Sequence, residues 1–151
     1  MKIATDIEQG HDLKYILGEN TADMYWEKHW AYKGDLRVMD SRFGHPRDEG
    51  VDHIPAWSLS NLLSLVPDSV AFINEERAAA DGITEDNEEY GFYAEQYDFQ
   101  LCGGNYEGIY LGSAKYAHSE GQVFFTEGKD PIDILVSTIK WLKSIDYYKS
   151  K

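Results

Sequence analysis

The sequence predicts an α+β protein with a mostly antiparallel sheet of five or six strands and about three helices packed on one face. Three observations lead to this prediction. Segments with helical spacing and clear start or stop residues occur near both ends of the chain and in its middle. Aromatic residues make up 14% of the chain, and such residues favour strands. Short turn sequences separate the strand-like segments, as in hairpins.

The chain of 151 residues has the usual length of one domain. We therefore expect a single compact domain over residues 1–151, because no internal repeat or linker interrupts it. A chain of this length buries about 68–70% of its unfolded surface, which is enough for a core without disulfides or metals.

The first helix is predicted to begin at Thr5, with Glu8 completing a capping box, and to end at Gly18. Its apolar face consists of Ile7, Leu13 and Leu17. Gly10 weakens this prediction, because glycine inside a helix costs about 1 kcal/mol relative to alanine.

Two strands are expected next, over 24–32 and 36–39, with a turn at 33–35 between them. The residues from Asp40 to His53 are polar and include two glycines and a proline, so a loop is expected there.

The stretch from Ile54 to Pro67 predicts a short helix between two prolines. Ser58 is a suitable N-cap, and Pro67 prevents continuation of the helix. One helical face would carry Leu59, Leu62, Leu63 and Val66. Two turns are marginal in isolation, so these leucines must pack on another element. The stretch is therefore interpreted as structural.

The middle of the chain predicts further strands. Ser69 to Asn74 is apolar enough for a central strand, and the acidic segment 75–89 is expected to be an exposed loop with a helical turn near Arg77. Strands over 90–101, 106–117 and 122–127 would form a meander with turns at 102–105 and 119–121.

The last helix has the clearest boundaries. Asp130 caps it, Pro131 takes the first helical position, and Asp133 adds favourable charge to the first turn. Its apolar stripe consists of Leu135, Ile139, Leu142 and Ile145.

The charge of the chain restricts its partners. Twenty-seven acidic residues face fourteen basic ones, for a formal net charge of −13. Such a chain repels phosphates and anionic membrane surfaces, so we expect neither direct nucleic-acid binding nor membrane binding. A basic protein surface fits this charge, although solubility alone would also explain it.

Cys102 is the single cysteine, so no internal disulfide can form. The N-terminal residues contain acids and no apolar core, unlike a signal peptide, and no apolar run reaches the roughly 20 residues of a membrane span. A cytoplasmic location is expected.

Four segments together resemble a group of small uncharacterised proteins encoded by anaerobic gut bacteria and their phages and mobile elements. The matching pieces are Glu8-Gln9, Thr21 to Met24, Pro55 to Pro67, and Asp130 to Leu142. The segment 90–125 is not specific to the group, and the acidic segment 75–89 has no counterpart in it. The resemblance implies an intracellular accessory protein of a mobile element and no known activity.

A metal site has one weak candidate, the loop residues His45, Asp48, Glu49 and His53. These side chains suit Zn²⁺ or a similar ion, but their spacing matches no standard site and a solvated polar loop explains them as well. The segment starting at Asp81 fails the EF-hand pattern, because Ile83 stands at its third position. We expect neither a metal nor a cofactor.

A catalytic site has no clear candidate either. Cys102 would need a neighbouring base, such as His118 or His29, to act as a nucleophile. No glycine-rich phosphate-binding motif is present.

Two groups of residues are candidate binding residues. Trp26, Trp30 and Tyr32 share one face of the predicted strand, which either enters the core or forms an exposed aromatic patch. The acidic segment contributes Glu85, Asp86, Glu88 and Glu89.

The sequence therefore favours a non-catalytic acidic binding protein that docks on a positively charged protein partner, as a monomer or homodimer. One mechanism is occupation of a nucleic-acid-binding groove, with carboxylates in place of phosphates. A small-ligand binding domain for a nucleotide or metabolite is the alternative, and a metal-dependent hydrolase is the second alternative. Whether any reaction is catalysed stays open, and the balance is against an enzyme.

Overall fold

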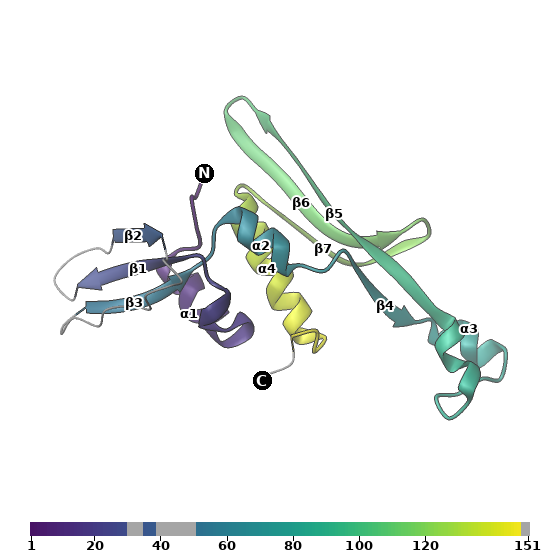
Figure 1. Ribbon diagram of the computed structural model, residues 1–151. Coiled ribbons are helices and arrows are strands. Elements are labelled where there is room, and N and C mark those ends of the chain that lie inside the picture. The colour runs from purple at the N-terminus through teal and green to yellow at the C-terminus, as the bar shows by residue number, and fades with distance from the viewer. Residues whose placement is uncertain (30–34, 39–50, 149–151) are drawn as a thin grey trace.

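The computed structural model describes residues 1–29, 35–38 and 51–148. It is an α+β fold with two antiparallel sheets, in the strand orders β2-β1-β3 and β4-β5-β6-β7 (Figure 1). In chain order the elements are α1 (Ile7–Leu17), η1 (Glu19–Thr21), β1 (Met24–His29), β2 (Asp35–Val38), β3 (Val51–Ala56), α2 (Leu59–Leu65), β4 (Ser69–Ile73), α3 (Glu75–Ala80), η2 (Glu88–Tyr93), β5 (Ala94–Tyr106), β6 (Ile109–His118), β7 (Gly121–Gly128) and α4 (Pro131–Ser144).

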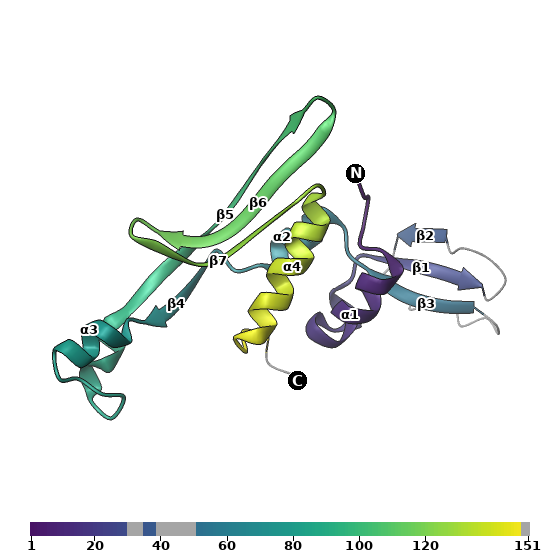
Figure 2. The same ribbon diagram turned by 180° about the vertical axis from the view of Figure 1, so that it is seen from behind.

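The predicted class and antiparallel pairing are confirmed, but the prediction of one sheet of five or six strands is wrong. The sheets have three and four strands, and α2 and α4 lie between them in both views (Figures 1 and 2). The reason is that α2 follows β3 after only two residues, so the chain leaves the first sheet before β4 begins the second. Each sheet can then bury one face against helices.

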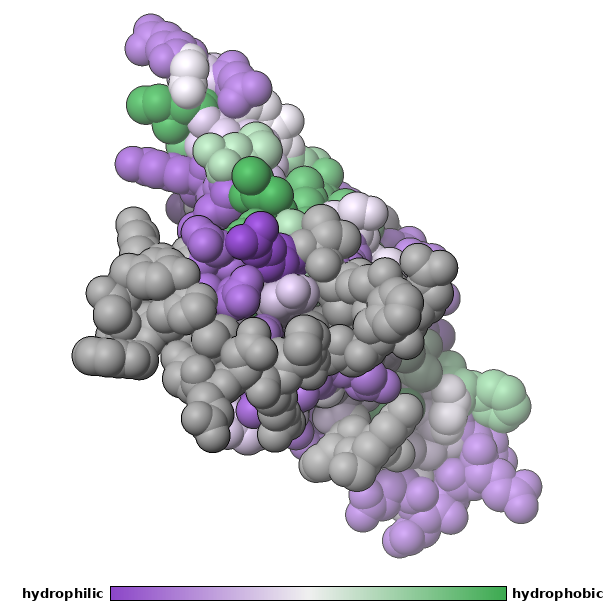
Figure 3. All heavy atoms as spheres, turned by 60° about the vertical axis from the view of Figure 1, so that its left-hand side comes forward, coloured by the Kyte–Doolittle hydropathy of each residue, from purple (hydrophilic) through white to green (hydrophobic). Residues whose placement is uncertain are grey.

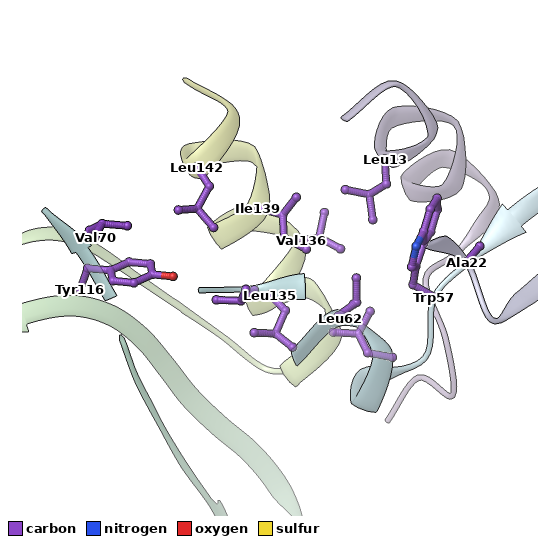
Figure 4. Packing of buried hydrophobic residues seen from close by; sticks show 12 residues of the cluster. Leu13, Ala22, Trp57, Leu62, Val70, Tyr116, Leu135, Val136, Ile139 and Leu142 are labelled. Atoms are coloured by element: carbon purple, nitrogen blue, oxygen red, sulfur yellow. The ribbon is translucent and has the colours of Figure 1, made fainter. Parts of the chain in front are cut away.

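The core joins both sheets through the helices (Figure 4). Leu13 and Trp57 pack on the side of the small sheet, whereas Val70 and Tyr116 pack on the side of the large one. The residues of α4 between them are Ile132, Leu135, Val136, Ile139 and Leu142. The predicted stripe of α4 is thus buried at three of its four positions, and Ile145 packs at the edge. The predicted cap at Asp130 is also confirmed, since its side chain accepts a hydrogen bond from the backbone of Ile132.

Trp57 connects three segments of the chain. Its indole N–H donates to Oγ1 of Thr21 at 2.9 Å, and its backbone N–H donates to Oγ1 of Thr5 at 3.0 Å. The backbone N–H of Thr5 donates in turn to the carbonyl of Trp57 at 3.0 Å. Because both side chains are fully buried, each of these polar groups needs its partner inside the protein.

Helix α1 begins one residue later than predicted. Asp6 is the N-cap and Gln9 completes the capping box, in place of Thr5 and Glu8. Thr5 is unavailable as a cap because its hydroxyl already accepts the hydrogen bond from Trp57. The predicted end at Gly18 is confirmed, with a φ of 81°.

Gly10, which weakened the prediction of α1, is required where α1 crosses β3. A Cβ at this position would lie 2.3 Å from the carbonyl oxygen of Pro55 and 2.9 Å from Cγ2 of Ile54. The helix therefore gives up some intrinsic stability so that its backbone can approach the strand closely.

The small sheet differs from the prediction at the loop 40–53. Residues 51–53 belong to β3, which continues through Pro55 and pairs with β1 along its whole length. The proline is compatible with the strand because β3 is at the edge of the sheet. Residues 30–34 and 39–50, including the ends of the two predicted strands, lie outside the described residues.

Helix α2 is confirmed, including its cap at Ser58 and its end before Pro67. Its predicted face is only partly right, because Leu63 is exposed at 39% whereas Leu62 and Val66 are buried. Leu65 packs on the core instead.

Strand β4 lies at the edge of the large sheet rather than at its centre, because it pairs only with the first five residues of β5. Val70 and Phe72 face the core, whereas Ala71 is exposed. The uniform apolar character of the segment therefore did not indicate burial on both faces.

The hairpin of β5 and β6 is longer than predicted. Residues 102–105 were expected to form a turn, but they continue β5, and the turn is at Glu107 and Gly108, which both have positive φ. Glycine pairs in a strand leave the ladder intact, so they do not by themselves end it. We call residues 100–111 the arm, because here neither β4 nor β7 pairs with the hairpin. The arm projects away from the helices (Figure 1).

Among the described residues, no helix is both long enough and apolar enough to cross a membrane.

Candidate functional site

The predicted aromatic patch on β1 is described only at Trp26. Its indole N–H donates to the carbonyl of Thr5 at 2.8 Å, and the side chain is half-buried. Trp26 thus joins β1 to the segment before α1, as expected of a structural residue. Trp30 and Tyr32 lie outside the described residues.

The weak metal candidate is described only at His53. The imidazole of His53 lies against the ring of Tyr25, with 5.4 Å between the ring centroids. The other three candidates, His45, Asp48 and Glu49, lie outside the described residues. Within the part of the chain that is described, no three His, Cys, Asp or Glu side chains gather as metal ligands would.

Cys102 and His118 do not form a catalytic pair. Cys102 is exposed on β5 and pairs with Ser113 of β6. His118 is an odd number of residues further along β6, so its side chain points to the opposite face of the sheet.

The acidic candidates lie at the end of the large sheet, next to α3. Glu85, Asp86, Glu88 and Glu89 are all exposed. Local hydrogen bonds hold this region: the hydroxyl of Tyr93 donates to Asp81 at 2.6 Å, and Thr84 bonds to Asn87. The acids therefore stand on an ordered surface.

Beside this surface is an open hollow with a volume of about 660 Å³. Its lining includes aromatic rings and carboxylates, namely Phe72, Tyr90, Tyr97, Glu75, Glu76 and Glu95. The rings of Phe72 and Tyr97 pack edge to face, with 6.0 Å between their centroids, and form an apolar part of the lining. We call this feature the acidic hollow.

Glu95 is the most connected side chain of the acidic hollow. Its carboxylate accepts a hydrogen bond from the amide of Asn74 at 2.9 Å and one from the hydroxyl of Tyr97 at 3.4 Å, and it lies 3.1 Å from Nε2 of His118. Asn74 also caps α3, by accepting from the backbone of Arg77. Through Asn74, Glu95 thus connects α3 to β5 of the large sheet.

The surroundings of His118 determine its tautomer. The backbone N–H of Glu120 donates to Nδ1 at 3.0 Å, so the proton is on Nε2 and is donated to Glu95. The imidazole also stacks on the ring of Tyr97 at 4.3 Å. His118 therefore orients Glu95 and Tyr97 rather than offering a free base.

The charge around the acidic hollow is almost entirely negative. Between Asn74 and Asp98 the chain has nine acidic residues and one basic residue, Arg77, whose guanidinium lies over the ring of Tyr93 at 5.9 Å. The acids are Glu75, Glu76, Asp81, Glu85, Asp86, Glu88, Glu89, Glu95 and Asp98.

Two pKa shifts follow from this arrangement. The hydrogen bonds from Asn74 and His118 lower the pKa of Glu95, which stays ionised to lower pH. Partial burial and the carboxylates of Glu75 and Glu85 raise the pKa of Tyr90, which stays neutral. The hollow therefore keeps fixed negative charge beside neutral rings.

Sequence reasoning identified the acids 85–89 but missed Glu95, Tyr97 and Asn74. It considered His118 only as a base for Cys102, whereas the imidazole contacts Glu95. The alternation of Glu95 and Tyr97 in a strand was a usable signal, since both must share a face. The approach of His118 depends on the register of β6 against β5, which the sequence does not specify.

Comparison of the chain with models of known protein families, with curated protein sequences and with solved structures finds no match.

Proposed function

We propose that this protein is a non-catalytic binding protein that docks its acidic hollow, and the acidic surface of residues 85–89, on a positively charged protein partner. The resemblance to proteins of phages and mobile elements suggests an accessory role for it.

The observation that carries the proposal is the composition of the acidic hollow. Carboxylates of Glu75, Glu76 and Glu95 stand around the rings of Tyr90 and Tyr97. A lysine or arginine side chain gains from both, by charge-assisted hydrogen bonds to the carboxylates and by contact with the ring faces. The open shape suits a side chain presented by another protein, whereas a small ligand needs a more enclosed pocket.

The charge also bears on the alternatives. A nucleotide would bring phosphates into a region where nine acids face one base, which costs electrostatic free energy. The same repulsion favours a partner whose own ligand is a nucleic acid, because the carboxylates would occupy positions that suit phosphates. Occupation of such a groove is the mechanism that we propose. The metal-dependent hydrolase has no observation in its favour among the described residues.

The test measures binding of a fluorescent arginine-rich peptide at several salt concentrations. A double variant, Glu88→Gln with Glu89→Gln, removes two charges from the acidic surface. The matched control, Glu107→Gln with Glu127→Gln, removes two charges from β7 and the turn of the arm. We expect the first variant to weaken binding about tenfold, which corresponds to about 1.4 kcal/mol, and the control to weaken it much less.

Tyr90→Ala extends the test to the aromatic part of the site. It should weaken peptide binding without changing the salt dependence, because it removes a ring and no charge. Equal losses in the two charge variants, or binding that does not respond to salt, would show that the acidic surface is not a docking site. Unchanged binding by Tyr90→Ala would show the same for the acidic hollow.

A further inference from the structure

The outer edge of the arm is an unpaired strand edge. β4 pairs with β5 only as far as Asp98, so from Gln100 to Tyr106 β5 pairs with β6 alone among the described strands. The backbone groups on the other side of this segment have no strand to bond within residues 1–29, 35–38 and 51–148. An edge of this kind binds another strand when nothing prevents the approach.

The pattern of hydrogen bonds shows which residues present these groups. In antiparallel pairs, successive residues direct their N–H and C=O alternately toward and away from the partner strand. The N–H of Phe99 points away from β6, because it donates to the carbonyl of Asp68 at 2.8 Å. By this alternation Leu101, Gly103 and Asn105 also face outward.

The usual protections of an exposed edge are missing from this segment. It contains no proline and no charged residue, and the bulge of the sheet is elsewhere, between Tyr116 and Ala117. Gly103 and Gly104 have no side chains to obstruct an approaching backbone. Large apolar side chains are exposed nearby, with Tyr106 at 68% and Ile109 at 53%.

The distribution of charge along the chain favours a second copy of the same chain as the partner of the free edge of β5. Glu107 is the only charged residue in the arm of a chain with a net charge of −13. The acidic hollow is at the opposite end of β5, beside α3 (Figure 1). In the space-filling view, hydrophobic residues lie among hydrophilic ones on the upper part of the molecule, and the lower end is mostly hydrophilic (Figure 3). Two copies joined antiparallel through their arms would hold their acidic ends far apart.

We propose that the arm is a homodimerisation strand, in which residues 100–106 of β5 pair antiparallel with the same residues of a second copy. The free segment is centred on Gly103. A two-fold axis at Gly103 therefore places the outward N–H and C=O groups of one copy opposite the outward groups of the other. Leu101 then stands opposite Asn105 of the second copy, and Gln100 opposite Tyr106. The two four-stranded sheets become one continuous sheet.

The first experiment measures mass in solution by sedimentation over a range of concentrations. The wild-type chain should approach twice its 17.3 kDa as the concentration rises. Asn105→Pro removes an outward N–H that β6 does not use and should stay a monomer, whereas Asn105→Ser keeps the N–H and should dimerise. A wild-type chain that stays monomeric, or an Asn105→Pro variant that dimerises like wild type, overturns the proposal.

The second experiment tests the register by cysteine crosslinking in a Cys102→Ser background. Leu101→Cys combined with Asn105→Cys places two cysteines about 13 Å apart in one chain, which is too far for a disulfide. Across the proposed interface their Cα atoms would be about 5.5 Å apart, which is within reach. Oxidation should give a covalent dimer of the double variant and much less from either single variant. Equal crosslinking of single and double variants contradicts this register.

The inference does not depend on the proposed function. The double variant Glu88→Gln with Glu89→Gln should dimerise like the wild type, and Asn105→Pro should bind the arginine-rich peptide like the wild type. Failure of one proposal is therefore distinguishable from failure of the other.

Discussion

Nε2 of His118 lies 3.1 Å from Oε2 of Glu95, and this contact joins the end of β6 to the beginning of β5. The other oxygen of the same carboxylate accepts the amide of Asn74, which caps α3. The carboxylate of Glu95 thus positions α3, the ring of Tyr97 and the imidazole of His118.

The stability of the protein should depend on pH through Glu95. Its pKa in the folded state is below the ordinary value of 4.5, because of the hydrogen bonds from Asn74 and His118. The stabilisation is therefore complete above pH 4.5 and is lost as the pH falls through the folded-state pKa. Glu95→Gln should reduce the free energy of unfolding at neutral pH, and the difference from wild type should shrink in acid. Urea unfolding over a pH series measures this, with Glu127→Gln as the control. A difference that is constant with pH would contradict the assignment.

Trp57 should be far more important for stability than the exposed aromatic residues. Trp57→Ala leaves a large cavity and deprives Thr21 of its donor, so we expect a loss of about 3–5 kcal/mol. Phe92, exposed at 86%, is the matched control, and Phe92→Ala should change the free energy of unfolding by less than about 0.5 kcal/mol. Chemical denaturation followed by circular dichroism compares the two, and similar losses would show that Trp57 is not central to the core.

Gly10→Ala should destabilise the protein although alanine favours helices. The new methyl group would collide with the carbonyl of Pro55, and such overpacking costs about 1–3 kcal/mol, more than the gain of about 1 kcal/mol in helix propensity. Gly91→Ala is the control, because nothing lies within 4 Å of a Cβ there. A rise in melting temperature for Gly10→Ala would mean that α1 and β3 are not in such close contact.

Alkaline pH should unfold the protein through Tyr116, which is buried, and Tyr148, which is half-buried. Burial raises the pKa of both Tyr116 and Tyr148 well above 10.0. Since the folded state holds these protons more tightly, stability is complete below pH 10 and decreases as the pH rises further. Absorbance titration should show a late group of tyrosines that ionise together with unfolding. In Tyr116→Phe with Tyr148→Phe the late group should disappear; its persistence would assign it to other tyrosines.

The helices were predictable because their boundaries are local. Ser58, Gly18 and Asp130 act within a few residues of their own positions, so the sequence alone indicates them. Thr5 misled the prediction because its hydroxyl binds Trp57, which is far away in the sequence. The division into two sheets also depends on how α2 and α4 pack between them, and these contacts join residues that are far apart in the sequence.

The candidate site was only partly predictable, for the same reason. The acids at 85–89 are visible as a run of charge in the sequence. By contrast, Glu95, Tyr97 and His118 meet only because β5 and β6 pair in one particular register. The glycine pair at 103 and 104 suggested a turn, and the true turn at 107 and 108 shifts every pairing between these strands.

The contacts of Lys2 and Gln9 with Asp133 have a consequence for synthesis on the ribosome. Both side chains bond to the same carboxylate oxygen of α4, each at 2.7 Å, and α1 packs on α4 as well as on β3. During synthesis α1 therefore meets one of its permanent neighbours only after more than a hundred further residues have been translated. Until then its apolar side is a natural target for chaperones.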